Sequence, residues 1–460
     1  MNKEYCENLL NKLLSTGADY AEIYEETCDS RTFSYLDSKL DRINEYHANG
    51  VGLRIAKGTE VYYASINYDD ISEVEKLADE LIKNISSKVI YKDIKLDNLE
   101  TIDAKWDKPL DSCSDDIVKN YMVNLDKEIR SRDKRITQVG LTLSERLKNI
   151  TVSNSKGVYK KEIRPNSRFY INVMFKDNDL LSKSTYNWGG SIGAEILDKD
   201  ISAGIDNLIK YGTDKLYAKN CIGKNMPVIL GPGFGAVIFH EACGHAMEAA
   251  ATANNQSVLS GKIGEKIASD KVTIIDDGSI EKLWGTTVID DEGEKTRKNI
   301  LIEDGVLKNY LNDEINNRKL KMDLTGSSRR ESYRFAPVSR MNNTYLKPGN
   351  DKIEDMIKSI DFGLYAVELG GGSVDPETGE FNFACDTAYM IRDGKIAECV
   401  KGATLIGNTL EILSNVEMVG SNLEYGVGNC GASSGWVPVT IGQPTIKVSS
   451  ILVGGVSDDN

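Results

Sequence analysis

The chain has 460 residues, a formal net charge of −14 and 40% hydrophobic residues. This length predicts two to three domains, and the acidic charge without a dominant basic patch argues against a nucleic-acid partner. No apolar run of about 18 residues occurs, so we expect no membrane-spanning helix. The first residues lack the apolar core of a signal peptide, and the eight cysteines show no pairing rhythm. Together these features predict a reduced, cytoplasmic protein.

Two similar series of elements are predicted in the first half of the chain, and we expect them to form units 1–110 and 111–220. The first unit is predicted to contain helix 2–16, strands Tyr20–Glu26, Arg31–Ser38, Gly50–Ala56 and Val61–Ile66, and helix Ile71–Ile85. The second is predicted to contain helix 114–131, strands Thr137–Glu145, Leu147–Ser153, Arg168–Lys176 and Leu180–Asn187, and helix 198–212. The polar stretch Ser86–Asp111 is the predicted junction.

The third predicted domain, residues 221–460, begins with a buried strand at Met226–Leu230, a glycine turn and an alanine-rich helix at Phe234–Ala251. Short strands with glycine-rich turns follow, among them Trp436–Thr440. We therefore expect an α+β fold. N-terminal helices and antiparallel meanders would precede a curved antiparallel sheet or partial barrel that carries the metal-binding helix.

Two of the three histidines lie in the segment His240-Glu241-Ala242-Cys243-Gly244-His245. Zinc favours imidazole and thiolate ligands, and a catalytic zinc keeps one position open for water. A glutamate beside the first histidine can accept a proton from that water. His240 and His245 are therefore predicted metal ligands, with Glu241 as the general base.

The five-residue spacing predicts a distortion of the helix that carries this motif. At about 100° per residue, His240 and His245 would diverge by roughly 140° on an ideal α-helix, too far to share a metal. A π-bulge would bring them together, and Gly244 could relax the backbone there.

The third ligand is open on chemical grounds. The candidates are Cys243, Glu248, Cys385, Cys399 and Cys430. Cys430 lies in a glycine-lined turn that can bring a thiolate close to a metal, while Glu248 shares a helix face with His245. Glu248 could instead brace His245 from outside the ligand shell. Cys243 is expected to fill an apolar slot.

Longer segments carry a resemblance to a known family. Together with HEACGH, four stretches resemble the TldD/PmbA metalloproteases: Ser327–Leu346, Gly370–Phe383, Ile391–Asn408 and Asn429–Val448. The likeness covers the C-terminal half in register and the N-terminal half more weakly. The chain resembles the TldD kind of subunit, which bears an HExxxH motif.

This resemblance implies one zinc per chain held by His240, His245 and Cys430, with Glu241 as base. It also implies a dimer around an internal chamber, formed with a second copy or with a motif-lacking PmbA/TldE-type paralogue. Unfolded or short peptides would enter and lie along a strand edge.

Arginines and glycines outside the motif are candidate substrate-binding residues. Arg329, Arg330, Arg334 and Arg340 are interleaved with Tyr333 and Tyr345. Of these we select Arg330, Tyr333 and Arg334 as candidates to hold a substrate carboxylate or oxyanion, against a structural role in ion pairs with neighbours such as Glu331. Gly371 and Gly372 could let a peptide approach the backbone closely. Asp290-Asp291-Glu292 is expected to be solvated loop charge.

The sequence therefore predicts a zinc-dependent peptidase that hydrolyses unfolded or short peptides with metal-activated water. Two alternatives are a non-catalytic, metal-stabilised peptide-binding scaffold or maturation partner, and a zinc hydrolase of a non-peptide amide. The glutamate argues against the scaffold, because a structural zinc has four protein ligands and needs no base.

Overall fold

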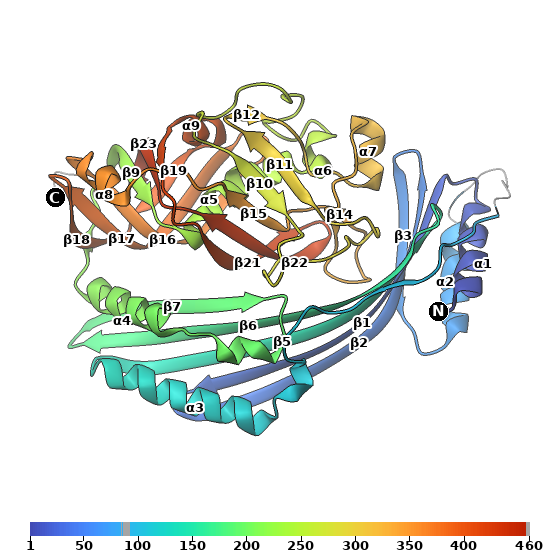
Figure 1. Cartoon of the computed structure of the whole chain (residues 1–460), viewed down its shortest axis with the longest axis horizontal. Helices are drawn as coiled ribbons and strands as arrows, with labels where there is room; N and C mark the ends of the chain where they lie inside the picture. Colours follow the sequence, from blue (N-terminus) through green and yellow to red (C-terminus); the bar gives the residue numbers. More distant parts are fainter. Residues whose placement is uncertain (84, 86–92, 457–460) are drawn as a thin grey trace.

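A computed structural model describes residues 1–83, 85 and 93–456 of the chain (Figure 1). The first unit comprises α1 (Lys3–Leu14), β1 (Tyr20–Leu36), β2 (Lys39–Lys57), β3 (Glu60–Asn67) and α2 (Ile71–Lys83). The short β4 (Glu100–Ile102) follows before residue 110, and the second unit comprises α3 (Asp115–Arg132), β5 (Ile136–Asn154), β6 (Tyr159–Asp177), β7 (Leu180–Gly190) and α4 (Ser202–Leu216). The four helices predicted in these two units are present, whereas the helix predicted at Phe234–Ala251 is broken into short turns, with Glu248 in an extended conformation. Residues 84 and 86–92 of the predicted α2 end and junction lie outside the described residues.

Two predicted strand breaks are wrong. Tyr20–Glu26 and Arg31–Ser38 belong to one strand, β1, and Thr137–Glu145 and Leu147–Ser153 belong to β5. The polar residues between them read as turns in the sequence. In the structure they continue the pairing, because β1 and β5 lie antiparallel from Glu22 opposite Asn154 to Leu36 opposite Gly140.

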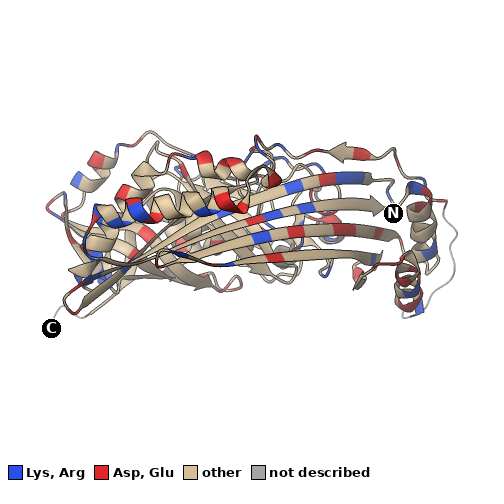
Figure 2. Cartoon of the chain, turned by 90° about the horizontal axis from the view of Figure 1, so that it is seen from below, with Lys and Arg blue, Asp and Glu red and all other residues tan. Residues whose placement is uncertain are grey.

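This β1–β5 pairing joins the two units into one seven-stranded sheet of order β3-β2-β1-β5-β6-β4, with β7 also paired to β6. One face of the sheet packs its apolar side chains against the four helices, with α1 and α2 at one end and α3 and α4 at the other. Figure 2 shows the long strands running between these helix pairs. The other face of the sheet lies toward the C-terminal domain (Figure 1).

The C-terminal domain is built on a closed barrel and a second sheet. Its strands are β8 (Lys219–Asn220), β9 (Lys224–Leu230), β10 (Ile274–Asp277), β11 (Lys298–Glu303), β12 (Val306–Leu307), β13 (Ser328–Arg329), β14 (Val338–Ser339), β15 (Asn343–Leu346), β16 (Phe362–Val374), β17 (Glu380–Arg392), β18 (Lys395–Lys401), β19 (Thr404–Asn408), β20 (Val416–Val419), β21 (Glu424–Ala432), β22 (Gly435–Gln443) and β23 (Ile446–Gly454). Its helices are α5 (Val237–Phe239), α6 (Ala249–Thr252), α7 (Glu314–Leu320), α8 (Ile353–Lys358) and α9 (Thr409–Ser414).

The strands β16-β9-β23-β19-β17 form a ring, because β17 pairs back onto β16. The ring is antiparallel except between β16 and β9, so the predicted partial barrel is in fact closed. The second sheet has the order β12-β11-β10-β15-β22-β21. The α+β fold class is confirmed. None of the helices among the described residues is long and apolar enough to cross a membrane.

Candidate metal centre

The helical segment after β9 changes its winding at the motif. A 3₁₀ turn at Gly233–Ala236 and the short α5 lead into a π-helical turn at His240–Gly244, and a second 3₁₀ turn follows at His245–Met247. The His245 backbone N–H bonds to the His240 carbonyl, the i to i+5 pattern of a π-turn. The predicted distortion is confirmed, and it places the two imidazole centroids 5.3 Å apart.

Gly244 has a role different from the predicted one. Its backbone is ordinary right-handed helix, with φ −59° and ψ −55°, so it does not relax the winding. A Cβ at this position would lie only 2.0 Å from the sulfur of Met341. Gly244 therefore provides space for Met341 to pack against the turn.

Three side chains converge at this turn. One ligand atom each from His240, His245 and Cys430 lies within 4.8 Å of the others, a group that could hold a metal ion. Cys430 lies within the paired strand β21 rather than in the predicted turn, and its Sγ is 3.0 Å from His245 Nε2. His240 is 3% exposed, and neither of its ring nitrogens has a hydrogen-bond partner. A buried polar group without a partner is unfavourable, so this donor set fits a metal chemically.

Glu248 and Arg340 hold the two sides of the centre in place. The Glu248 carboxylate meets His245 Nδ1 at 2.9 Å and accepts the Met341 backbone N–H at 3.3 Å. Arg340 is fully buried and donates to the Cys430 carbonyl at 2.5 Å and to the Ser434 hydroxyl at 3.0 Å. Glu248 thus orients a histidine from outside the group, as metal-site carboxylates commonly do.

The sequence did not indicate this contact of Arg340. Its partner is a backbone carbonyl 90 residues away, and backbone acceptors leave no signal in residue type.

Burial and neighbouring charges set the protonation of the group. Burial lowers the pKa of His240 well below its usual range, and the charges of His245 and Arg340 act in the same direction. Burial alone would also lower the pKa of His245, but Glu248 and Cys430 raise it well above the ordinary value. Burial raises the pKa of Glu241, whose carboxylate is 3.6 Å from His245 Nε2. A carboxylate with a raised pKa is suited to accept and return a proton.

The other candidate ligands lie elsewhere. Cys243 is fully buried in the apolar core, as expected. Cys385 and Cys399 lie on β17 and β18 and are not part of the converging group. Gly371 and Gly372 are exposed on β16. Gly371 has open space around it, whereas a Cβ at Gly372 would meet Phe383 at 2.1 Å.

The predicted substrate-binding residues of the arginine segment contact the N-terminal sheet. Arg330 forms a buried ion pair with Glu22 at 2.5 Å, rather than with Glu331. The Tyr333 hydroxyl donates to Asn67 at 2.6 Å, and the exposed Arg334 lies beside the Tyr333 ring. These contacts favour a structural role for Arg330 and Tyr333.

The expectation of solvated charge at Asp290-Asp291-Glu292 is wrong. All three residues are at most 3% exposed. Glu292 pairs with Arg54 of β2 at 2.6 Å, and Asp291 pairs with Arg164 of β6 at 2.5 Å. Asp291 and Glu292 are therefore paired with cations of the N-terminal sheet, whereas Asp290 accepts the backbone N–H groups of Glu292, Glu294 and Ser328. Sequence spacing gave no sign of these partners.

Comparison with known proteins identifies the class. The PmbA/TldA metallopeptidase models match in chain order: domain 1 over residues 21–85, the central domain over 105–207 and the C-terminal domain over 223–455. The chain therefore belongs to the PmbA/TldD metallopeptidase family, and it is of the TldD kind.

Individual relatives agree with this assignment. A protein named metalloprotease TldD homolog from Haemophilus influenzae is 33% identical, covering 98% of this chain and 96% of the relative. A zinc metalloprotease TldD homolog from Saccharolobus solfataricus is 25% identical over 97% of this chain and 99% of its own.

Two solved structures share the fold. TldE from Thermococcus kodakarensis superimposes with a TM-score of 0.76 at 21% identity, covering 98% of this chain and 99% of that one. A putative modulator of a DNA gyrase from Thermotoga maritima gives a TM-score of 0.80 at 19% identity, covering 98% and 100%.

Proposed function

We propose that this chain is a zinc-dependent peptidase that hydrolyses unfolded or short peptides. The observation that carries the proposal is the convergence of His240, His245 and Cys430 beside the Glu241 carboxylate, with both nitrogens of the buried His240 unpartnered. Two imidazoles and a thiolate suit zinc, and three protein ligands leave one position open.

The residues have separate roles in this proposal. His240, His245 and Cys430 hold the metal, and Glu248 fixes the His245 ring through Nδ1. When bound, zinc would activate a water and polarise the scissile carbonyl. Glu241 accepts the proton of the attacking water on its carboxylate and returns it to the leaving amine. Its raised pKa supports this exchange.

The working assembly is proposed to be a dimer, with a second copy or with a motif-lacking TldE-type paralogue. The likeness to the fold of TldE from Thermococcus kodakarensis supports compatible subunit shapes. Peptides would reach the centre within such a dimer as extended strands. Activity assays therefore require the chain both alone and with its paralogue.

Cleavage of casein-derived peptides tests the proposal, with the wild type, Glu241→Gln and a chelator-treated sample compared. We expect cleavage only by the metal-loaded wild type, because Glu241→Gln keeps the ligands and removes the base. Metal retained by a wild type that cleaves nothing, alone or with its paralogue, would instead favour the peptide-binding scaffold.

A further inference from the structure

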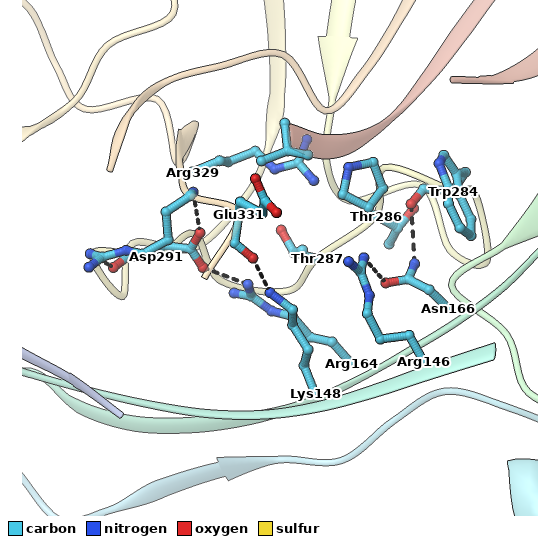
Figure 3. A pocket seen from close by; sticks show the side chains of 13 residues that line it. Arg146, Lys148, Arg164, Asn166, Trp284, Thr286, Thr287, Asp291, Arg329 and Glu331 are labelled. Atoms are coloured by element: carbon cyan, nitrogen blue, oxygen red, sulfur yellow. Dashed lines mark hydrogen bonds and ion pairs between the residues drawn. The ribbon is translucent and has the colours of Figure 1, made fainter. Parts of the chain in front are cut away.

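A small cavity of about 30 Å³ lies where the N-terminal sheet meets the C-terminal domain. Figure 3 shows Arg146, Lys148 and Arg164 rising into it from the sheet, with Arg329 reaching in from the opposite side. Arg330 completes a set of five cationic side chains on the wall. The cavity has room for a few non-hydrogen atoms and is lined by several cations, so it suits a small anionic group.

Three of these cations already have carboxylate partners. Lys148 pairs with Glu26, Arg164 with Glu162 and Asp291, and Arg330 with Glu22. The cavity wall also carries two carboxylates. Asp291 pairs with Arg164, whereas Glu331 has no ion-pair partner among the described residues and accepts the backbone N–H of Trp436 at 2.8 Å.

Arg146 and Arg329 differ from the other three. Neither has a carboxylate within ion-pair distance among the described residues. Arg146 donates to the Asn166 amide oxygen at 3.1 Å, and its Nε is buried without a partner. Arg329 is 5% exposed and donates to the Met341 carbonyl at 2.6 Å. Each guanidinium therefore retains N–H groups that no protein anion engages.

The environment of Arg329 is unfavourable for its charge. Burial lowers the pKa of Arg329 to about 10; the charges of Asp291 and Asp276 act against this shift, and those of Arg340 and Arg164 act with it. A buried cation without a partner is strongly destabilising, and a bound anion relieves that penalty.

The sheet surface around Arg146 has the same character. Arg146 shares one face of the sheet with every second residue of β1 from Ser30 to Ser34, and with the residues paired to these on β2, β5, β6 and β7. These positions hold only Ser, Thr, Asn, Tyr, Gly and Arg. The charged residues among them are Arg42, Arg146 and Arg168, with no Asp or Glu. In a chain with a net charge of −14, a surface without acids favours the approach of an anion.

One wall of the cavity is formed by the strand that pairs with the Cys430 strand. Val437 and Pro438 of β22 form part of its wall, and Val437 is directly opposite Cys430 on β21. Neighbouring strands are about 4.8 Å apart. The Met341 carbonyl that Arg329 contacts belongs to the residue whose N–H bonds to Glu248.

We propose that Arg146 and Arg329 bind a carboxylate of the peptide substrate in this cavity, and so select peptides with a carboxylate near the scissile bond. The inference rests on the proposed peptidase function. Arginine suits the role because its planar N–H groups match a carboxylate.

Binding to the metal-loaded Glu241→Gln full chain tests the inference without requiring cleavage. The probes are one short labelled peptide with a free C-terminal carboxylate, the same peptide as a C-terminal amide, and that amide with a glutamate replacing a glutamine near its end. We expect at least one of the two carboxylate peptides to bind about tenfold tighter than the plain amide. The arm that gains affinity identifies the carboxylate as terminal or side-chain.

Substitutions then locate the interaction. In the same background, Arg146→Gln and Arg329→Gln should each reduce the carboxylate preference to near unity, with metal content and melting temperature checked. The half-buried Arg146 keeps the test valid if the Arg329 variant does not fold. Arg168→Gln is the matched control. Arg168 also bonds to an asparagine, Asn187, and has a buried Nε without a partner, but it does not line the cavity.

Equal binding of the acids and the amide would overturn the carboxylate site. An equal loss in Arg168→Gln would overturn the cavity as its location, because general attraction to the sheet face would then explain the preference. A preserved carboxylate preference in a wild type that cleaves no peptide would instead separate this site from the proposed peptidase function.

Discussion

Side chains far apart in the sequence stabilise each other at the metal centre. His240 and His245 come from one turn, Cys430 from a strand about 190 positions later, and Glu248 and Arg340 fix their orientation. The motif predicted the histidines and the glutamate, because these residue types and their spacing carry the chemistry. The contact of Arg340 with a backbone carbonyl left no pattern in the sequence.

Removing the brace at Glu248 should weaken metal binding without removing a ligand. Glu248→Ala takes away the acceptor at His245 Nδ1, and losing such a partner typically costs about 10- to 100-fold in metal affinity. Competition with a chromophoric chelator measures the affinity. Glu377→Ala, at an exposed position, is the control and should bind metal like the wild type. Unchanged affinity in Glu248→Ala would contradict the bracing role.

Metal affinity should rise with pH. The pKa of His245 in the metal-free chain is raised well above its ordinary value, although burial alone would lower it, because Glu248 and Cys430 favour the charged ring. A metal ligand must be neutral, so below that raised pKa each metal displaces at least one proton. We expect about a tenfold gain in affinity per pH unit in that range, measured by chelator competition at several pH values. A pH-independent affinity would exclude this coupling.

At the scale of elements, local pattern predicted the helices and the strands that flank the site, and spacing predicted the π-turn. It missed the continuity of β1 and β5, since their central polar residues resemble turns and only pairing with each other keeps them extended. The sequence pattern also suggested the wrong role for Gly244, because the contact of Gly244 with Met341 joins residues that are far apart in the sequence.

Gly244→Ala should disturb the π-turn. Its new methyl group would overlap the buried Met341 side chain, and overpacking a core typically costs about 1–3 kcal/mol. Chemical denaturation and metal content measure the effect, and Met341→Ala in the same chain should recover part of the metal binding. Gly371→Ala is the control, because nothing lies within 4 Å of a Cβ there. A fully stable, metal-binding Gly244→Ala chain would show that this packing is unimportant.

At the scale of the whole molecule, buried ion pairs join the N-terminal sheet to the C-terminal domain. Glu22 of β1 lies between Arg54 and Arg330, and Arg54 also pairs with Glu292. The sequence showed an acidic run and a basic segment but not which charges meet. That pairing depends on how the two domains dock.

Loss of the Glu22 charge should destabilise the chain in a pH-dependent way. Burial alone would raise the pKa of Glu22, but the charges of Arg54 and Arg330 lower it by more, so the pKa lies below the ordinary value of 4.5. The stabilisation is therefore present above about pH 4.5 and is lost as pH falls through the lower folded-state pKa. Breaking such a pair typically costs about 3–5 kcal/mol, so Glu22→Gln should be less stable at neutral pH and closer to wild type in acid.

Urea denaturation across this pH range measures the difference. Glu281→Gln is the control, because the exposed pair with Lys105 should contribute no measurable stability. A Glu22→Gln chain as stable as the wild type at neutral pH would show that this ion pair does not stabilise the contact between the two domains.

The most direct test of the account is the absorption spectrum of the cobalt-substituted chain, because cobalt(II) occupies zinc sites and a thiolate ligand adds a charge-transfer band. We predict about one cobalt per chain and a thiolate band in the wild type and in Glu241→Gln, and loss of that band in Cys430→Ser. A wild type that binds no cobalt, or a band that survives in Cys430→Ser, would contradict a centre formed by His240, His245 and Cys430.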